Sequence, residues 1–243
     1  MMKWIGAVVA LGLAVGCASA PDPDPVKHGA TLVAQMKAAS GGAKLDSLTT
    51  YHQTSRLVRD GTINGESESW GDCRTGAFAI IETIEGATVT AGYDGKVGWQ
   101  LGPDGKPRTE SDPGRLASTR LNSYLNTQGY FFVDRFPATF TYRGQREVNG
   151  KIHDLVTVTA RDYLPIDIDL LIDPGTHRLA GIAGKMGPME MQGVIDHYEV
   201  IDGVLTAKHA MQTMKGAATH TEEIFILSHT YGPVPPERLR VPK

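Results

Sequence analysis

The sequence predicts an α+β domain that is mainly antiparallel β, with a strongly curved sheet and two helices against its concave face. From Thr49 onward apolar residues recur with a period of two, which is typical of half-buried strands. Dipeptides that favour tight hairpins interrupt these strands at Asp60-Gly61, Asn64-Gly65, Asp94-Gly95, Asp104-Gly105, Asn149-Gly150 and Asp202-Gly203. A sheet with so many strands and one apolar face must curl around something, and two helices cover only part of it. The remaining apolar surface could line a hydrophobic cavity.

The N-terminus is typical of an export signal. A short basic start precedes an apolar run, residues 4–16, that is too short to cross a bilayer. The segment Leu13-Ala14-Val15-Gly16-Cys17 resembles the lipobox of bacterial lipoproteins, which predicts that residues 1–16 are a signal peptide and that Cys17 receives lipid. Ala18-Ser19-Ala20 offers an alternative, an A-x-A end for ordinary cleavage that would release a soluble chain beginning at Pro21. Both alternatives export the protein.

Location follows from the same segment. Ala18, which comes directly after Cys17, resembles the sorting signals of outer-membrane lipoproteins. We therefore expect the protein in the bacterial periplasm, anchored to the outer membrane through the lipid on Cys17. Residues 17–25 alternate proline with polar residues and predict an extended tether with a reach of roughly 25 Å. Residues 26–243 are expected to form a single domain.

Two helices are predicted. Apolar residues recur at helical spacing over residues 26–39, Asp24 and Pro25 suit the cap and first turn, and Gly41-Gly42 ends the helix. A second helix is predicted over 113–127 and is followed by the aromatic run 130–132. The strands are predicted near 49–59, 63–71, 76–84, 87–93, 97–101, 138–148, 151–160, 165–173, 177–185, 189–200, 203–214 and 218–229.

Alternation gives the sheet two unlike faces. Between Ile166 and Asp173 the residues Ile166, Ile168, Leu170 and Ile172 share one face, while Asp167, Asp169 and Asp173 share the other. These aspartates lack a glycine-centred loop that could wrap a cation, so a solvated outer face is the favoured interpretation. His197, His209, His220 and His229 fall on the last three predicted strands and are interpreted as ordinary strand residues. No metal site and no cofactor are therefore expected.

Composition and motifs exclude several functions. The formal net charge is −3 at pH 7, with no basic cluster, so no nucleic-acid partner is expected. The chain lacks a G-x-S-x-G elbow and a phosphate-binding glycine loop, so an enzyme is not expected. Its two cysteines are Cys17 and Cys73. Because Cys17 is lipidated or removed, no internal disulfide is expected, and Cys73 is interpreted as a small residue in a turn.

The segment Asp94-Gly95-Lys96-Val97-Gly98-Trp99-Gln100-Leu101-Gly102-Pro103 resembles the D-G-K-x-x-W-x-x-x-P hairpin of LolA-type lipoprotein carriers. In this motif Asp94, Gly95, Lys96, Trp99 and Pro103 are the matching residues. The order of elements, a helix followed by glycine-punctuated strands, is also similar. The resemblance implies an open antiparallel half-barrel of about eleven strands with helical lid segments. Asp72-Cys73-Arg74 departs from the family's pattern, and an anchoring Cys17 is closer to LolB than to the soluble LolA.

The resemblance also implies a function. Its members shield acyl chains inside the half-barrel and carry or receive lipoproteins, so the expected partners are the acyl chains of lipid or lipoprotein cargo and the membrane that holds the N-terminal lipid. A monomer is expected. An anchored binding or scaffold module on the same fold is the alternative. The candidates for the cavity or its lid are Leu121, Tyr124, Leu125, Phe131, Phe132, Met189, Met191 and Met211. For the methionines, ordinary core filling is the favoured interpretation.

Overall fold

The computed structural model describes residues 22–161, 163–164, 166–186 and 188–243, so Cys17 and most of the tether lie outside the described residues. Within these ranges the elements are α1 (Pro25–Ala39), α2 (Ala43–Ser47), β1 (Thr50–Arg59), β2 (Ile63–Asp72), β3 (Phe78–Ile84), β4 (Ala87–Tyr93), β5 (Gly98–Leu101), β6 (Pro107–Thr109), α3 (Pro113–Asn126), the 3₁₀ helix η1 (Gly129–Phe131), β7 (Thr139–Val148), β8 (Lys151–Thr159), β9 (Ile168–Ile172), β10 (Leu179–Met186), β11 (Met189–Ile201), β12 (Val204–Lys215), β13 (Thr219–Tyr231) and the 3₁₀ helix η2 (Pro236–Leu239).

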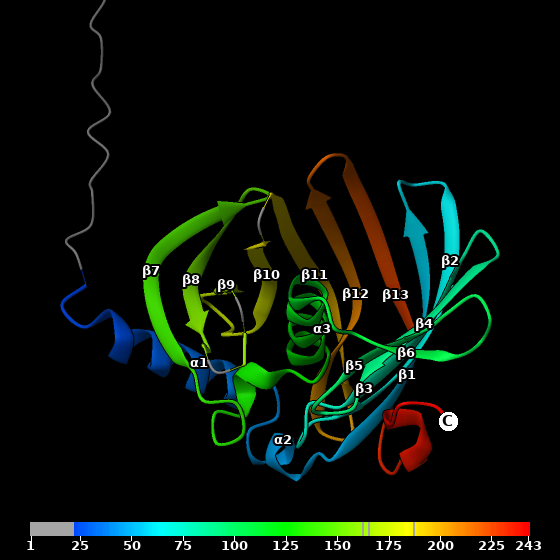
Figure 1. Cartoon of the computed structure of the whole chain (residues 1–243). Coiled ribbons are helices and arrows are strands. Elements are labelled where there is room, and N and C mark those ends of the chain that lie inside the picture. Colours follow the sequence, from blue (N-terminus) through cyan, green and yellow to red (C-terminus); the bar gives the residue numbers. More distant parts are fainter. Residues whose placement is uncertain (1–21, 162, 165, 187) are drawn as a thin grey trace, which may run out of the picture.

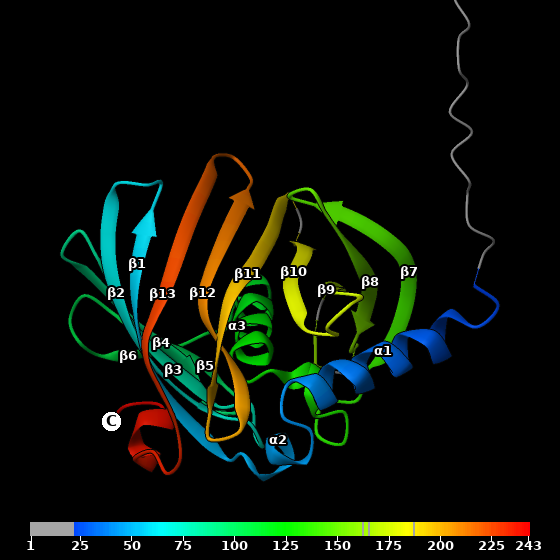
Figure 2. The same cartoon turned by 180° about the vertical axis from the view of Figure 1, so that it is seen from behind.

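The described strands form one antiparallel sheet with the order β6-β5-β4-β3-β2-β1-β13-β12-β11-β10-β9-β8-β7. The sheet curves around α3 but remains open, because β6 and β7 stand at opposite ends of this order (Figure 1). The view from behind shows α1 running beside β7 (Figure 2). Glycine at position 29 allows this close approach, because a Cβ there would lie 2.6 Å from the backbone oxygen of Phe140. The predicted α+β half-barrel is confirmed.

Five of the six predicted hairpin dipeptides lie in turns between paired strands, and three of them have the expected type I′ geometry. Asp60-Gly61, Asn149-Gly150 and Asp202-Gly203 each have two positive φ values, as a type I′ turn requires. The expectation that Asn64-Gly65 makes a hairpin was wrong, because both residues lie inside β2, opposite Val58 and Leu57 of β1. Asp60-Gly61 already closes the hairpin between these strands, and a dipeptide three residues later continues the ladder.

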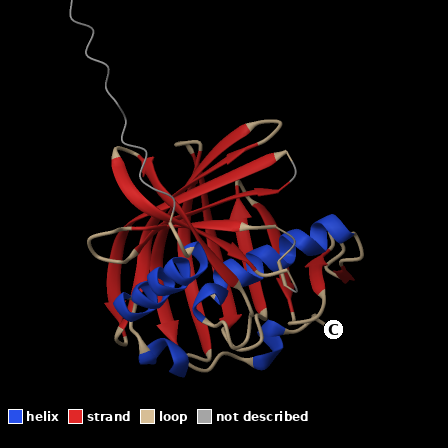
Figure 3. Cartoon of the chain, turned by 90° about the vertical axis from the view of Figure 1, so that its left-hand side faces the viewer, coloured by secondary structure: helices blue, strands red, loops and turns tan. Residues whose placement is uncertain are grey.

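Both predicted helices are confirmed, and so is the predicted cap of the first. Asp24 accepts a hydrogen bond from the backbone N–H of Lys27 at the start of α1, and Asp112 accepts one from the N–H of Arg115 at the start of α3. Sequence reasoning did not find α2 or β6. Both are too short for a periodic pattern, with five and three residues. The side view shows the helices gathered in the lower half, against the curved strands (Figure 3).

One large core joins both longer helices to half of the sheet. Leu32, Val33 and Met36 of α1 and Leu121 and Tyr124 of α3 belong to the same buried cluster. The strands contribute the apolar face that alternation predicted, since Ile168, Leu170 and Ile172 are completely buried. A smaller cluster on the opposite face joins Trp70 and Trp99 to Leu239 of η2. The helices therefore fill one half of the concave side.

Candidate ligand cavity on the concave face

A cavity of about 410 Å³ lies in the other half of the concave side, between α3 and the strands β1–β4, β12 and β13. Its volume falls within the range of small-molecule sites. The lining contains both apolar and polar side chains. The apolar part is Leu57, Phe78, Ile80, Val89, Ala91 and Ile224, and the polar part is Gln53, Ser55, Ser67, Ser69, Glu82, Thr119, Asn122, Asn126, Gln212 and Glu222.

Small side chains on the concave face explain why this space exists. Ser55 of β1 lies opposite Ser67 of β2, and Ala91 of β4 lies opposite Ile80 of β3. Residues opposite each other in an antiparallel ladder share one face, so these positions leave room above the sheet where larger residues would fill it. Large side chains occupy the same face over β7–β9. The cavity therefore lies where the side chains on the concave face are small.

A chain of hydrogen bonds reaches the cavity from the partly buried ring of His229. Nδ1 of His229 lies 3.0 Å from Oε1 of Gln53, and Nε2 of Gln53 donates to Oγ of Ser55 at 3.2 Å. Burial lowers the pKa of His229 to about 4, with the charges of Lys208 and His52 acting in the same direction, so the ring is neutral at pH 7. Because Oε1 of Gln53 can only accept, Nδ1 carries the proton. Nε2 of His229 is buried without a hydrogen-bond partner.

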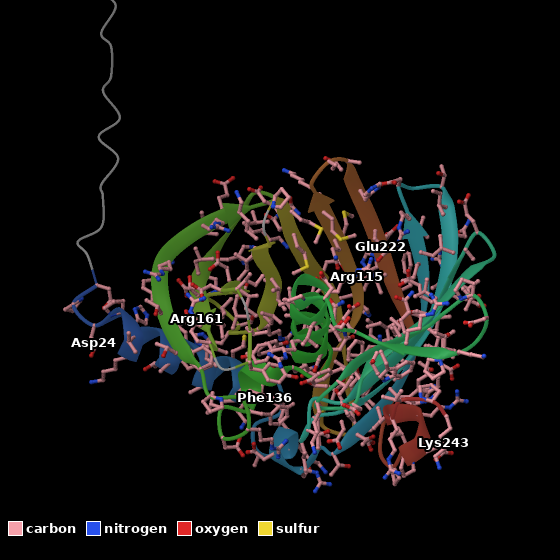
Figure 4. The ribbon with its side chains drawn as sticks, viewed as in Figure 1. Asp24, Arg115, Phe136, Arg161, Glu222 and Lys243 are labelled. Carbon is pink, nitrogen blue, oxygen red and sulfur yellow. The ribbon has the colours of Figure 1, made fainter. Side chains whose placement is uncertain are left out.

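An ion-paired cluster joins the lining. Nη2 of Arg59 lies 2.9 Å from Oε1 of Glu222 and 3.6 Å from Oε1 of Glu82. Glu222, labelled in Figure 4, comes from β13, while Glu82 comes from β3. Burial and the charge of Glu222 raise the pKa of Glu82, although the guanidinium of Arg59 opposes this. With both carboxylates ionised, the cluster carries one surplus negative charge.

The two flanks of α3 have different roles. Thr119, Asn122 and Asn126 line the cavity. Leu121 and Tyr124 are buried in the large core, where the ring of Tyr124 lies 5.9 Å from that of Phe136. Sequence reasoning followed the apolar flank of this helix and missed the polar one. The spacing of 119, 122 and 126 was the signal that could have found it.

The remaining lid candidates lie in or against the core. Phe131 and Phe132 are 5% and 1% exposed, and Leu125 packs against the same cluster. The guanidinium of Arg135 lies 4.6 Å from the centre of the Phe132 ring. The structure therefore places both phenylalanines under α3 and away from the lining of the cavity.

The methionine candidates are divided between the two faces of the sheet. Met191 lies opposite Met214 in the ladder, whereas Met211 lies opposite Val194. Met211 is three residues from Met214 along β12, so the two side chains point to opposite faces. Met211 is half exposed and Met189 is 37% exposed. The structure does not bring these three methionines together.

The hairpin motif shapes a turn and one buried cluster. Asp94 accepts hydrogen bonds from the backbone N–H groups of Lys96 and Val97, and Gly95 has a φ of +94°. Trp99 is buried against Trp70 on the face opposite the cavity, and Pro103 follows β5 in the turn to β6. These residues lie outside the cavity lining. Their contacts hold the turns and the cluster around Trp70.

The histidines and aspartates considered for a cation have other partners. His209 hydrogen-bonds to Asp196 and Glu223, and His220 to Asp60. Asp167 and Asp169 accept hydrogen bonds from Thr159 and Thr157. Among the described residues, no group of three or more histidine, cysteine or acidic side chains is arranged to hold a metal ion. Burial raises the pKa of Cys73 to about 12, so this thiol stays protonated.

Comparison with known proteins identifies the fold. No family model and no curated protein match the chain. A LolA superfamily protein from Nitrosomonas europaea matches with a TM-score of 0.57 and 8% identity over 87% of this chain and 97% of the other. A domain from Vibrio parahaemolyticus described as an outer membrane lipoprotein-sorting protein gives 0.57 and 10% over 88% and 97%, and a DUF1329 family protein from Desulfovibrio piger gives 0.53 and 14% over 86% and 93%. The chain has the LolA-like fold. No helix in the described part of the chain is long and apolar enough to cross a membrane.

Proposed function

We propose that this protein is a periplasmic carrier or acceptor of amphiphilic lipid or lipoprotein cargo, anchored to the outer membrane through a lipid on Cys17. In this proposal it acts as a monomer and takes part in lipoprotein sorting. The observation that carries the proposal is the cavity of about 410 Å³ between α3 and the curved sheet. The LolA-like fold supports it, and so does the lipobox-like segment that ends at Cys17.

The lining suits a chain with a polar end. Each buried methylene contributes about 0.8 kcal/mol, so several methylenes against Leu57, Phe78, Ile80 and Ile224 offset the cost of leaving a membrane. The serine hydroxyls and the side-chain amides of the lining, including that of Gln212, can hydrogen-bond to a polar group beside that chain. The cavity therefore fits one amphiphile with its head group partly inside.

A scaffold or binding module that moves no cargo is the second candidate. One observation favours it: side chains from α1, α3 and η1 fill the half of the concave side over β7–β9. In that case the remaining cavity would be an incidental gap and would bind acyl chains no better than any exposed apolar surface.

A matched pair of variants distinguishes these candidates. Ser67 lines the cavity, whereas Ser228 is exposed and lies opposite Thr54 on the other face of the sheet. The full chain carrying Cys17→Ser, purified without detergent, would be titrated with a fluorescent fatty-acyl probe. We expect Ser67→Phe to weaken binding by about tenfold or more, which corresponds to 1.4 kcal/mol, and Ser228→Phe to leave it unchanged. Equal affinity of the two variants would favour the scaffold.

A further inference from the structure

A second pocket lies on the convex face of the sheet, outside the proposed cargo cavity. It has a volume of about 510 Å³ and is bounded by residues of β7, β8 and β10–β12 and by two neighbouring turns. Val194 and Met211 lie opposite each other in the β11–β12 ladder and both line it. Val194 also packs against the buried cluster of Val148, Leu155 and Leu171, which lies on the opposite face from the large core. The floor of the pocket is therefore apolar.

The rim carries two cations without partners. Lys151 begins β8 and Arg178 precedes β10, so each follows a turn, and both side chains line the pocket. Both residues are exposed, and neither side chain makes an ion pair or a hydrogen bond with another described residue, since the only bond from Arg178 to a side chain comes from its backbone N–H. Lysine and arginine in this state are available to bind an anion.

The two carboxylates at the same rim are already engaged. Asp173 accepts hydrogen bonds from the backbone N–H groups of Gly175 and Thr176 and from the hydroxyl of Thr176, which is the largest cause of its lowered pKa. Asp196 lies 2.5 Å from Nδ1 of His209. Neutral donors leave Asp173 with its negative charge, whereas Asp196 is paired with His209, so Lys151, Arg178 and Asp173 together leave one surplus positive charge at the rim.

A buried, unpartnered nitrogen also points to a ligand. His153 lines the pocket, is 4% exposed, and its Nδ1 has no hydrogen-bond partner. Leaving a buried polar atom unpaired is costly, so such atoms are usually satisfied by another protein group, a ligand or ordered water. In the neutral tautomer that carries its proton on Nδ1, a carboxylate oxygen held between Lys151 and Arg178 would be an acceptor of the right chemistry for this nitrogen.

From these observations we propose that the convex pocket binds a single-chain anionic amphiphile of the fatty-carboxylate class. The carboxylate lies between Lys151 and Arg178, and the first methylenes of the chain lie over Val194 and Met211. The site is independent of the cargo cavity, because the two lie on opposite faces of the sheet.

The test uses sodium dodecanoate, 1-dodecanol and dodecylammonium with the full chain carrying Cys17→Ser. The methyl group of Met211, identified with Met211→Leu, serves as a local probe in a protein labelled with ¹³C at the methionine methyls. We expect dodecanoate to shift this signal and to bind at least about fivefold more tightly than the alcohol, with dodecylammonium weakest. The double variant Lys151→Gln/Arg178→Gln should lose this preference, while Lys151→Arg/Arg178→Lys should retain it.

Ser67→Phe provides the second control, because it fills the cargo cavity and leaves the convex face intact. We expect the Met211 response to dodecanoate to persist in this variant. An unmoved Met211 signal, equal binding of dodecanoate and dodecylammonium, or loss of the response in Ser67→Phe would each overturn the proposal. Since the readout is at Met211, failure here leaves the cargo cavity and its own test unaffected.

Discussion

Arg59 and Glu222 lie directly opposite each other in the β1–β13 ladder, and their side chains form an ion pair of 2.9 Å inside the concave face. The pair is only partly exposed, with 11% of the Glu222 side chain accessible. Glu82 lies 3.6 Å from the same guanidinium, so one cation serves two carboxylates. Glu82 therefore lacks a full counter-charge, and its pKa is raised by burial and by the charge of Glu222.

Glu82→Gln should stabilise the protein at neutral pH. The pKa of Glu82 is raised above its ordinary 4.5, chiefly by burial, so the folded protein holds this proton more tightly than the unfolded chain does. Its contribution to the free energy of unfolding therefore falls as pH rises from about 4.5 through the folded pKa. We expect a gain of a few tenths to about 1 kcal/mol at pH 7 that disappears below pH 4. Urea denaturation at both pH values measures this, and Glu147→Gln, at an exposed position of β7, should show no such gain.

His229 should remain neutral at pH values where His209 is charged. Its pKa is lowered to about 4 by burial, whereas hydrogen bonds to Asp196 and Glu223 outweigh the burial of His209 and raise that pKa above 6.5. Because the unfolded chain protonates His229 first, its contribution to stability falls as pH drops from 6.5 toward 4. Imidazole NMR signals recorded across this range should show His209 protonated and His229 neutral at pH 6. A normal titration of His229 near 6.5 would contradict the buried network with Gln53.

Phe132→Ala should lower stability strongly without changing acyl affinity. Phe132 is 1% exposed within the large core, and replacing a buried phenylalanine by alanine typically costs about 3–5 kcal/mol. Its neighbour Val133 is 47% exposed, so Val133→Ala should have almost no effect. Denaturant midpoints and acyl-probe affinities of the folded variants measure both quantities. A small stability change with a large loss of affinity would instead support a lid role for Phe132.

Cys17→Ser should abolish acyl labelling and release the protein from the membrane. The prediction follows from the lipobox-like segment Leu13 to Cys17. Labelling with an alkyne-tagged fatty acid, followed by membrane fractionation, measures both outcomes. If labelling is absent from the unmodified protein and the mature chain begins at Pro21, ordinary cleavage after Ala20 is the correct alternative.

The sheet, its hairpins and both longer helices could be predicted because they depend on local signals. Period-two patterning gave the apolar face of β9, and the backbone preferences of Asp60-Gly61 and Asn149-Gly150 placed two turns. Asn64-Gly65 carries the same local signal but lies inside β2, because only one turn can join two strands. Local preference alone could not decide between the two dipeptides.

The cavity could not be predicted in this way, because it depends on which side chains face one another across the sheet. Ser55, Ser67 and Ala91 look unremarkable along the chain, and their shared face depends on strand register. Phe131 and Phe132 gave a strong aromatic signal, yet they lie in the core. The cavity depends on the size and polarity of residues that are paired across strands. Some of this pairing joins distant segments of the chain, as where Ser55 of β1 lies opposite Ile226 of β13.

The most direct test of the proposed function is native mass spectrometry of the Cys17→Ser chain after incubation with gently extracted membrane lipid. The measurement is made in the Lys151→Gln/Arg178→Gln background, which keeps the convex pocket from contributing. In that background we predict one bound amphiphile that is lost in Ser67→Phe and retained in Ser228→Phe. Absence of any bound amphiphile, or one that Ser67→Phe retains in that background, would contradict a carrier that holds its cargo between α3 and the sheet.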